Sequence, residues 1–161
     1  MKPKQSSWIR LSLAAFAGVL LAAGQPAAAQ TRTAMLVEVS SPLAARSAAG
    51  QVEETVNFSG QVSVVGREIV DTVFNAPTVL QLVIDLSKLT GTGSVSGRTF
   101  VTTAQAIVHR PLAATDKVQV SFAYYPKDSP QNARTGLLTL NVFHSTAGGL
   151  SATAVVGAAS F

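Results

Sequence analysis

The feature that most constrains the fold is an alternation of apolar and polar residues that begins at Val52. Apolar side chains fall on every second position, interrupted only by Glu54 and Gly60. The apolar set is Val52, Val56, Phe58, Val62 and Val64, and the polar set is Glu53, Thr55, Asn57, Ser59, Gln61 and Ser63. A repeat of two is typical of a β-strand with one dry face and one solvated face. A glycine inside such a strand, here Gly60, indicates a bulge or a bend.

Further strand patterns follow at short intervals, and turn residues separate them. The candidates are Arg67–Phe74, Thr78–Ser87, Thr99–His109, Lys117–Tyr125, Leu137–His144 and Leu150–Val156, with a shorter one, Ala34–Val39, before them. Turns are expected at Asn75–Pro77 and at Gly91–Ser94. Regularly spaced short strands without helical patterns are typical of a sandwich or a small barrel. We therefore expect an all-β fold: a single antiparallel β-sandwich of about seven to nine strands, with a small closed β-barrel as the alternative.

Residues 1–29 predict a cleavable secretory signal peptide, whose helix would precede the β-domain. Lys2, Lys4 and Arg10 supply the positive start, and 14 uncharged residues follow as Leu11–Gly24. Ala27 and Ala29 place small side chains at the −3 and −1 positions before Gln30, as signal peptidase requires. A membrane-spanning helix needs about 20 apolar residues, so we expect cleavage and no stable membrane span afterwards. The general secretion route would deliver the mature chain to the periplasm, the cell surface or the medium.

Removal of the signal peptide changes the charge of the chain. The precursor carries twelve basic and eight acidic residues, a net charge of +4; loss of three basic residues with the signal leaves a net charge of +1. A nearly neutral domain with scattered basic residues lacks the electrostatic footprint of a nucleic-acid-binding protein. The mature length of 132 residues suits one domain. We expect a flexible lead-in or edge strand over residues 30–50 and the all-β domain over residues 51–161.

The sequence contains no cysteine. Disulfides, thiol nucleophiles, thiolate metal sites and covalent haem attachment are therefore excluded. A glycine run at Gly91–Gly97 approaches a phosphate-binding loop, but its third glycine comes one position too late and no helix follows it. We expect a hairpin turn there and no bound cofactor.

The two histidines, His109 and His144, show no metal-ligand spacing with each other or with a carboxylate. They would form a metal or acid–base site only if the fold brought both together with Asp116. Asp71 is the one acidic residue whose burial the pattern leaves open. No residue is assigned a catalytic, cofactor-binding or metal-binding role, and we expect a protein without enzymatic activity.

The loop after the strand Lys117–Tyr125 holds the only candidate recognition surface, formed by Tyr125, Lys127 and Arg134. The sequence favours an exported β-sandwich with a binding or structural role, whose partner is a protein or another component of the cell envelope. Two alternatives stay open. One is a subunit of a surface fibre or adhesive assembly that joins by strand addition through Ala34–Val39. The other is a small barrel that carries an apolar ligand. The oligomeric state is not indicated.

Overall fold

The computed structural model describes residues 32–46, 52–74, 76–145, 147 and 149–158. These form nine strands in one antiparallel sheet, whose bounds are β1 Arg32–Arg46, β2 Val52–Asp71, β3 Ala76–Asp85, β4 Leu89–Gly93, β5 Thr99–Val101, β6 Gln105–Pro111, β7 Thr115–Pro126, β8 Arg134–Ser145 and β9 Gly149–Ala158. The order along the sheet is β6-β3-β2-β4-β5-β7-β8-β9, and β1 pairs with β2. The all-β class and the antiparallel sandwich are thus confirmed, and the signal segment lies outside the described residues.

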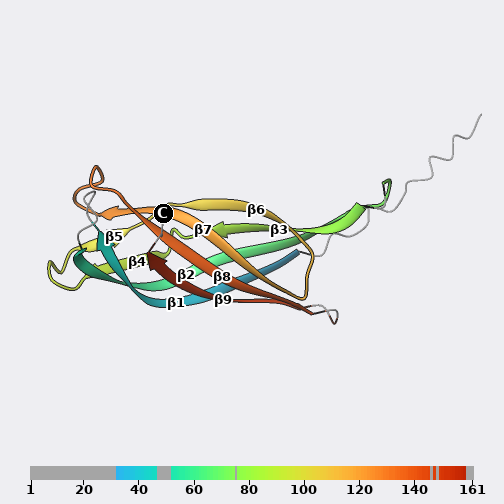
Figure 1. The fold of residues 1–161 in the computed structure, drawn as a ribbon, viewed down its shortest axis with the longest axis horizontal. Coiled ribbons are helices and arrows are strands. Elements are labelled where there is room, and N and C mark those ends of the chain that lie inside the picture. The colour runs from blue at the N-terminus through green and yellow to red at the C-terminus, as the bar shows by residue number, and fades with distance from the viewer. Residues whose placement is uncertain (1–31, 47–51, 75, 146, 148, 159–161) are drawn as a thin grey trace, which may run out of the picture.

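The sheet folds over on itself to make two layers. Strands β7 and β8 run diagonally across β1, β2 and β3 (Figure 1), and β5 links the layers through a short pairing with the end of β7. The sheet is not closed into a barrel: β6 and β9 are the two ends of the hydrogen-bonded path, although β9 packs beside β1. The sandwich rather than the closed barrel is therefore the observed form.

The core lies between the two layers and is centred on aromatic rings. Phe58 from β2 meets Tyr124 from β7 edge to face at 5.2 Å between ring centroids, and it meets Phe122 in the same way at 6.0 Å. Phe100 from β5 adds a third contact, to Tyr124 at 5.9 Å. Edge-to-face pairs add to the free energy gained by burying the rings. The alternation that begins at Val52 therefore predicts the dry face correctly, because Val56, Phe58, Val62 and Val64 are all buried.

Strand β2 is longer than the sequence pattern indicates. It runs unbroken from Val52 to Asp71, so the separate strand expected at Arg67–Phe74 is wrong in its bounds. Residues 56–60 of β2 pair with β4, and residues 63–71 pair with β3. Gly60 lies where the partner changes and has φ +132°, while its register with β1 continues without a shift. The expected irregularity is therefore a positive φ rather than a bulge against β1.

Other strand bounds also differ from expectation. The single strand expected at Thr99–His109 is two strands, β5 and β6, which pair with different neighbours. The segment expected as a short strand, Ala34–Val39, is part of β1, which pairs with β2 from Arg32 to Arg46 and buries Val37, Val39 and Leu43. Gly91 and Gly93, expected in a turn, belong to β4. A side chain at Gly91 would collide with Val56 and Phe58, so this strand needs glycine to lie beneath the aromatic core. The hairpin turn itself follows at residues 94–96, between β4 and β5, and is confirmed.

Candidate functional site

Four ionisable side chains occupy core-facing strand positions at one end of the sandwich. We call this group the end cluster: Glu68, Arg110, Asp116 and His144. Alternation along each strand sets their direction. Glu68 follows buried Val64 and Gly66 on β2, His144 follows Val142 on β8, and Asp116 precedes Val118 on β7, each by an even number of residues. Arg110 on β6 is in register with buried Leu80. The apolar core thus ends in a layer of paired polar side chains.

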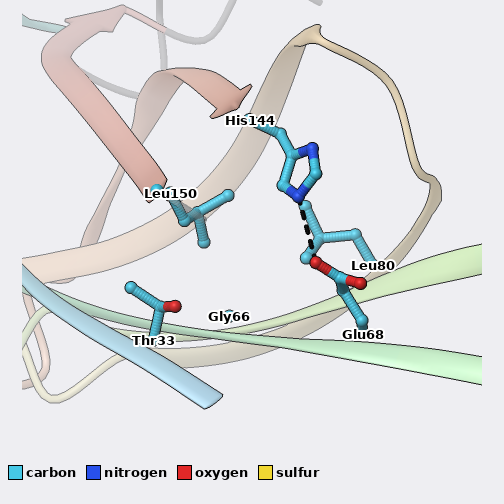
Figure 2. A pocket seen from close by; sticks show the side chains of 7 residues that line it. Thr33, Gly66, Glu68, Leu80, His144 and Leu150 are labelled. Carbon is cyan, nitrogen blue, oxygen red and sulfur yellow. Dashed lines mark hydrogen bonds and ion pairs between the residues drawn. The ribbon is translucent and has the colours of Figure 1, made fainter. Parts of the chain in front are cut away.

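His144 and Glu68 form the innermost pair of the end cluster. The His144 Nε2 atom lies 3.0 Å from Glu68 Oε1, beside a small pocket lined by Thr33, Gly66, Leu80, Gly149 and Leu150. A histidine–carboxylate pair supports nucleophilic catalysis when a hydroxyl lies at the second ring nitrogen. Figure 2 shows that this nitrogen points away from both Thr33 and Glu68. The pair therefore joins β8 to β2 without a catalytic hydroxyl from Thr33.

Arg110 and Asp116 form the second pair, across the short connection between β6 and β7. Arg110 Nε donates to Asp116 Oδ2 at 2.7 Å, and Nη2 donates to Oδ1 at 3.0 Å. This two-pronged hydrogen bond, together with the guanidinium charge, lowers the pKa of Asp116 below its ordinary value against the opposing effect of partial burial. Both carboxylate oxygens are already engaged, so the pair ties two strands together and leaves little capacity to bind a ligand.

The histidine site that sequence reasoning considered does not assemble. His109 lies on the outer face of β6, where its Nε2 is hydrogen-bonded to the side-chain amide of Gln81 at 2.9 Å. His144 faces the core and His109 faces solvent, so the fold does not bring the two histidines together. Within the described ranges, no group of three histidine or acidic side chains is arranged to hold a metal ion. Asp71 accepts hydrogen bonds from the backbone N–H groups of Val73 and Phe74, which shapes the β2–β3 turn.

The three residues expected to form a recognition surface are divided between two faces. Arg134 is in register with buried Tyr124, and its guanidinium lies 5.5 Å from the centre of the Phe100 ring. Tyr125 is in register with Val101 and takes the opposite direction from Tyr124, as alternation requires. Lys127 is exposed, and its backbone N–H donates to the Thr99 carbonyl. The positions of the signal cleavage residues, Ala27, Ala29 and Gln30, lie outside the described residues.

Glu54 is held at the other end of the sandwich. Partial burial acts to raise its pKa, but hydrogen bonds from the backbone and hydroxyl of Ser96 outweigh this effect, and the net shift is downward. This carboxylate anchors the β4–β5 turn to β2. Like the end cluster, it is engaged in holding strands together.

A different surface combines exposure with a regular pattern. The strands β1, β2, β3 and β6 lie side by side, and their outward residues form three rows in register, which we call the outer face. The basic row is Arg32, Arg67, Gln81 and His109; the apolar row is Ala34, Val65, Val83 and Ile107; and the third row is Leu36, Ser63, Asp85 and Gln105. Ile107 is 64% exposed, Leu36 57% and Val83 38%. The apolar row therefore runs across four strands on the solvent side.

The outer face is also hollowed. A shallow depression lies between the basic and apolar rows and is lined by Arg32, Val65, Arg67, Gln81 and Val83. Val83 interrupts the polar positions of β3, and Ile107 does the same on β6. These two apolar residues at outward positions are the indication of the outer face that the sequence gives, and the strand register is needed to show that they are neighbours.

No protein-family model matches the chain, and neither a curated protein nor a solved structure is significantly similar to it. The part of the chain that the structure describes contains no helix long and apolar enough to cross a membrane.

Proposed function

We propose that this protein is an exported, non-catalytic β-sandwich of the cell envelope that binds another protein through its outer face. The observation that carries the proposal is the apolar row of Ala34, Val65, Val83 and Ile107 on the solvent side of the sheet. Contiguous exposed apolar surface marks binding sites on folded domains more often than isolated apolar residues do.

The charges around the apolar row favour a protein partner. Arg32 and Arg67 lie on one side of the row, and Asp85 lies on the other, with Glu38 one row further out. A nucleic acid or an anionic membrane would be repelled by these carboxylates. An apolar centre bordered by both signs of charge is typical of protein–protein interfaces.

Export is supported by the sequence of residues 1–29. The basic start, the short apolar segment and the small residues before Gln30 together match a cleavable signal peptide. Expression of the full chain in a bacterial host, followed by fractionation and N-terminal sequencing, tests this part. A mature chain that begins at Gln30 outside the cytoplasm supports export, and an uncleaved cytoplasmic chain contradicts it.

A site-specific crosslinker tests the binding part. We would place a photoactivatable residue at Ile107 on the outer face and, as the matched control, at Val155 on β9, which is 54% exposed. Crosslinks to a protein from position 107 and none from position 155 support the proposal. Crosslinks from position 155 alone would contradict it.

Strand addition is the second candidate function, and the free edge of β6 favours it. Among the described strands, β6 pairs only with β3, and the hydrogen-bonded path of the sheet ends there. Such an edge is a template for an added strand. The donor would not be β1, because β1 is paired with β2 throughout its length. Protection of the amides of residues 105–111 from hydrogen exchange in the assembled state would distinguish this mode from binding to the outer face.

A further inference from the structure

The charges of the outer face are arranged on opposite sides of its apolar row. On β2, Arg67 lies two residues after Val65, on the basic side of the apolar row. On β3, Asp85 lies two residues after Val83 and on the opposite side of the row, because the two strands are antiparallel. Arg32 extends the basic side on β1, and Glu38 extends the acidic side. A surface with an apolar centre, a basic flank and an acidic flank is complementary to itself after a half-turn.

We infer that the partner on the outer face is a second copy of this chain, packed face to face about a twofold axis that runs along the apolar row. The inference rests on the proposed function and names its partner. Rotation about this axis places Val83 against Val83 of the second copy and Val65 against its Val65. It also exchanges the two flanks, so that the basic row of each copy lies over the third row of the other copy. An isologous contact of this kind closes at a dimer.

The exchange of flanks brings opposite charges together. Strand β3 of one copy lies over β3 of the other, so Asp85 of the second copy lies over Gln81, next to Arg67 in the same row. Within the described ranges, Arg32 and Arg67 have no ion-pair partner of their own, so their guanidinium groups are available. Packed sheets cross at roughly 30°, which displaces the outer strands β1 and β6 more than the central β2 and β3. The pair between Arg67 of one copy and Asp85 of the other is therefore the pair that this crossing angle displaces least.

The size of the outer face sets the strength of the contact. Four strands and about six residues along each correspond to about 400 Å² per copy, from a strand spacing of ~4.8 Å and a rise of ~3.3 Å per residue. Stable interfaces bury about 800 Å² on each partner. The dimer is therefore weak and forms at high local concentration, as in a crowded periplasm or a surface layer.

Sedimentation equilibrium of the secreted mature protein, from micromolar to millimolar concentration, tests the inference. We expect a monomer–dimer equilibrium whose dissociation constant rises at least tenfold with Val83→Glu, because the axis brings the two introduced carboxylates together. Val155→Glu, the same change at a more exposed position on β9, leaves it unchanged. If Val83→Glu fails to fold by circular dichroism, Ile107→Glu on the edge strand replaces it. A chain that stays monomeric throughout, or a dimer that Val155→Glu disrupts instead, overturns the inference.

The charged flanks supply an independent readout. Arg67→Glu places a carboxylate beside Asp85 of the second copy, so it weakens the dimer. Adding Asp85→Asn removes this repulsion and recovers part of the affinity, while the amide oxygen can still accept the hydrogen bond from Ser87 N–H. If Arg67→Glu and the double variant had equal dissociation constants, the proposed pairing of the basic and acidic flanks would be overturned.

The crosslinker at Ile107 separates this inference from the proposed function. Crosslinks between two copies of the chain support both. Crosslinks to a different envelope protein, with a monomer in the centrifuge, overturn the second-copy inference and leave the proposed function standing. No protein crosslink from position 107, with a monomer in the centrifuge, overturns both.

Discussion

The hydroxyl of Ser41 on β1 accepts a hydrogen bond from the backbone N–H of Val156 on β9 at 3.2 Å, between residues that are 115 positions apart. Strands β1 and β9 lie side by side here, but no ladder of backbone hydrogen bonds joins them. Ser41 and Val156 are both buried. A serine side chain therefore satisfies a backbone donor at the seam where the sheet comes close to closing.

Replacing Ser41 with alanine is expected to lower the free energy of unfolding by about 1–3 kcal/mol, because it leaves a buried N–H group without its acceptor. Urea denaturation followed by circular dichroism measures the change. Ser40→Ala is the control, since Ser40 lies on the exposed side of the same strand. Equal effects of the two substitutions would show that the seam does not depend on this bond.

Gly60 is expected to resist substitution for a conformational reason. Its φ of +132° is a region that side chains disfavour, and a Cβ atom there would overlap the backbone carbonyl oxygen of Lys88. Gly60→Ala should therefore cost about 1–3 kcal/mol of stability. Gly157→Ala, where a Cβ meets nothing within 4 Å, should be neutral or slightly stabilising. Thermal unfolding of both variants checks the contrast, and a Gly60→Ala protein as stable as the parent would contradict it.

Phe58 is the residue that links the aromatic rings of the two layers. Phe58→Ala removes edge-to-face contacts with Phe122 and Tyr124 and leaves a cavity, with an expected loss of about 3–5 kcal/mol. Phe143→Ala is the control on β8, because Phe143 is exposed, and it should change stability by less than about 0.5 kcal/mol. If the denaturant midpoints of the two variants coincided, the centre of the core would not lie at Phe58.

The sequence predicts the fold class because the core strands carry their own pattern. Alternation on β3, β7 and β8 points to the residues that the structure buries, such as Leu82, Phe122 and Leu140. The pattern is less informative where burial depends on a neighbour. Strand β1 extends through a Ser/Pro/Ala segment because β2 pairs with all of it. Strand β4 has glycine at position 91 because Val56 and Phe58 occupy the space above it, and at position 93 because Glu54 and Ser96 do.

The candidate site could not be predicted in the same way. The apolar row takes one residue from each of four strands, and residues such as Ala34 and Ile107 are far apart in the sequence. Only the register brings them together, and a shift of one residue would turn each side chain to the other face. The end cluster has the same origin, since His144 meets Glu68 across 76 residues. The proposed recognition residues Tyr125, Lys127 and Arg134 stay a prediction.

The Arg110–Asp116 pair should make part of the stability dependent on acidic pH. Asp116 has a lower pKa in the folded chain than its ordinary value of 3.8, chiefly because the Arg110 side chain donates to it. A carboxyl group with a depressed pKa stabilises the fold fully above its unfolded pKa, and this contribution is lost as the pH falls through the folded value. Asp85, whose pKa is lowered by the N–H of Ser87, acts in the same direction. Stability should therefore decline between about pH 5 and pH 2.

Arg110→Met isolates the contribution of the pair. The difference in free energy of unfolding between the parent and this variant should be largest near neutral pH and should shrink as Asp116 becomes protonated. It should also be small, because the Arg110 side chain is 44% exposed and water screens its charge. Lys117→Met, beside Asp116 on β7 and exposed, controls for the loss of one positive charge. Urea midpoints measured at a series of pH values provide the comparison. A difference that persists unchanged to pH 2 would assign the effect of Arg110 to its packing rather than to its bond with Asp116.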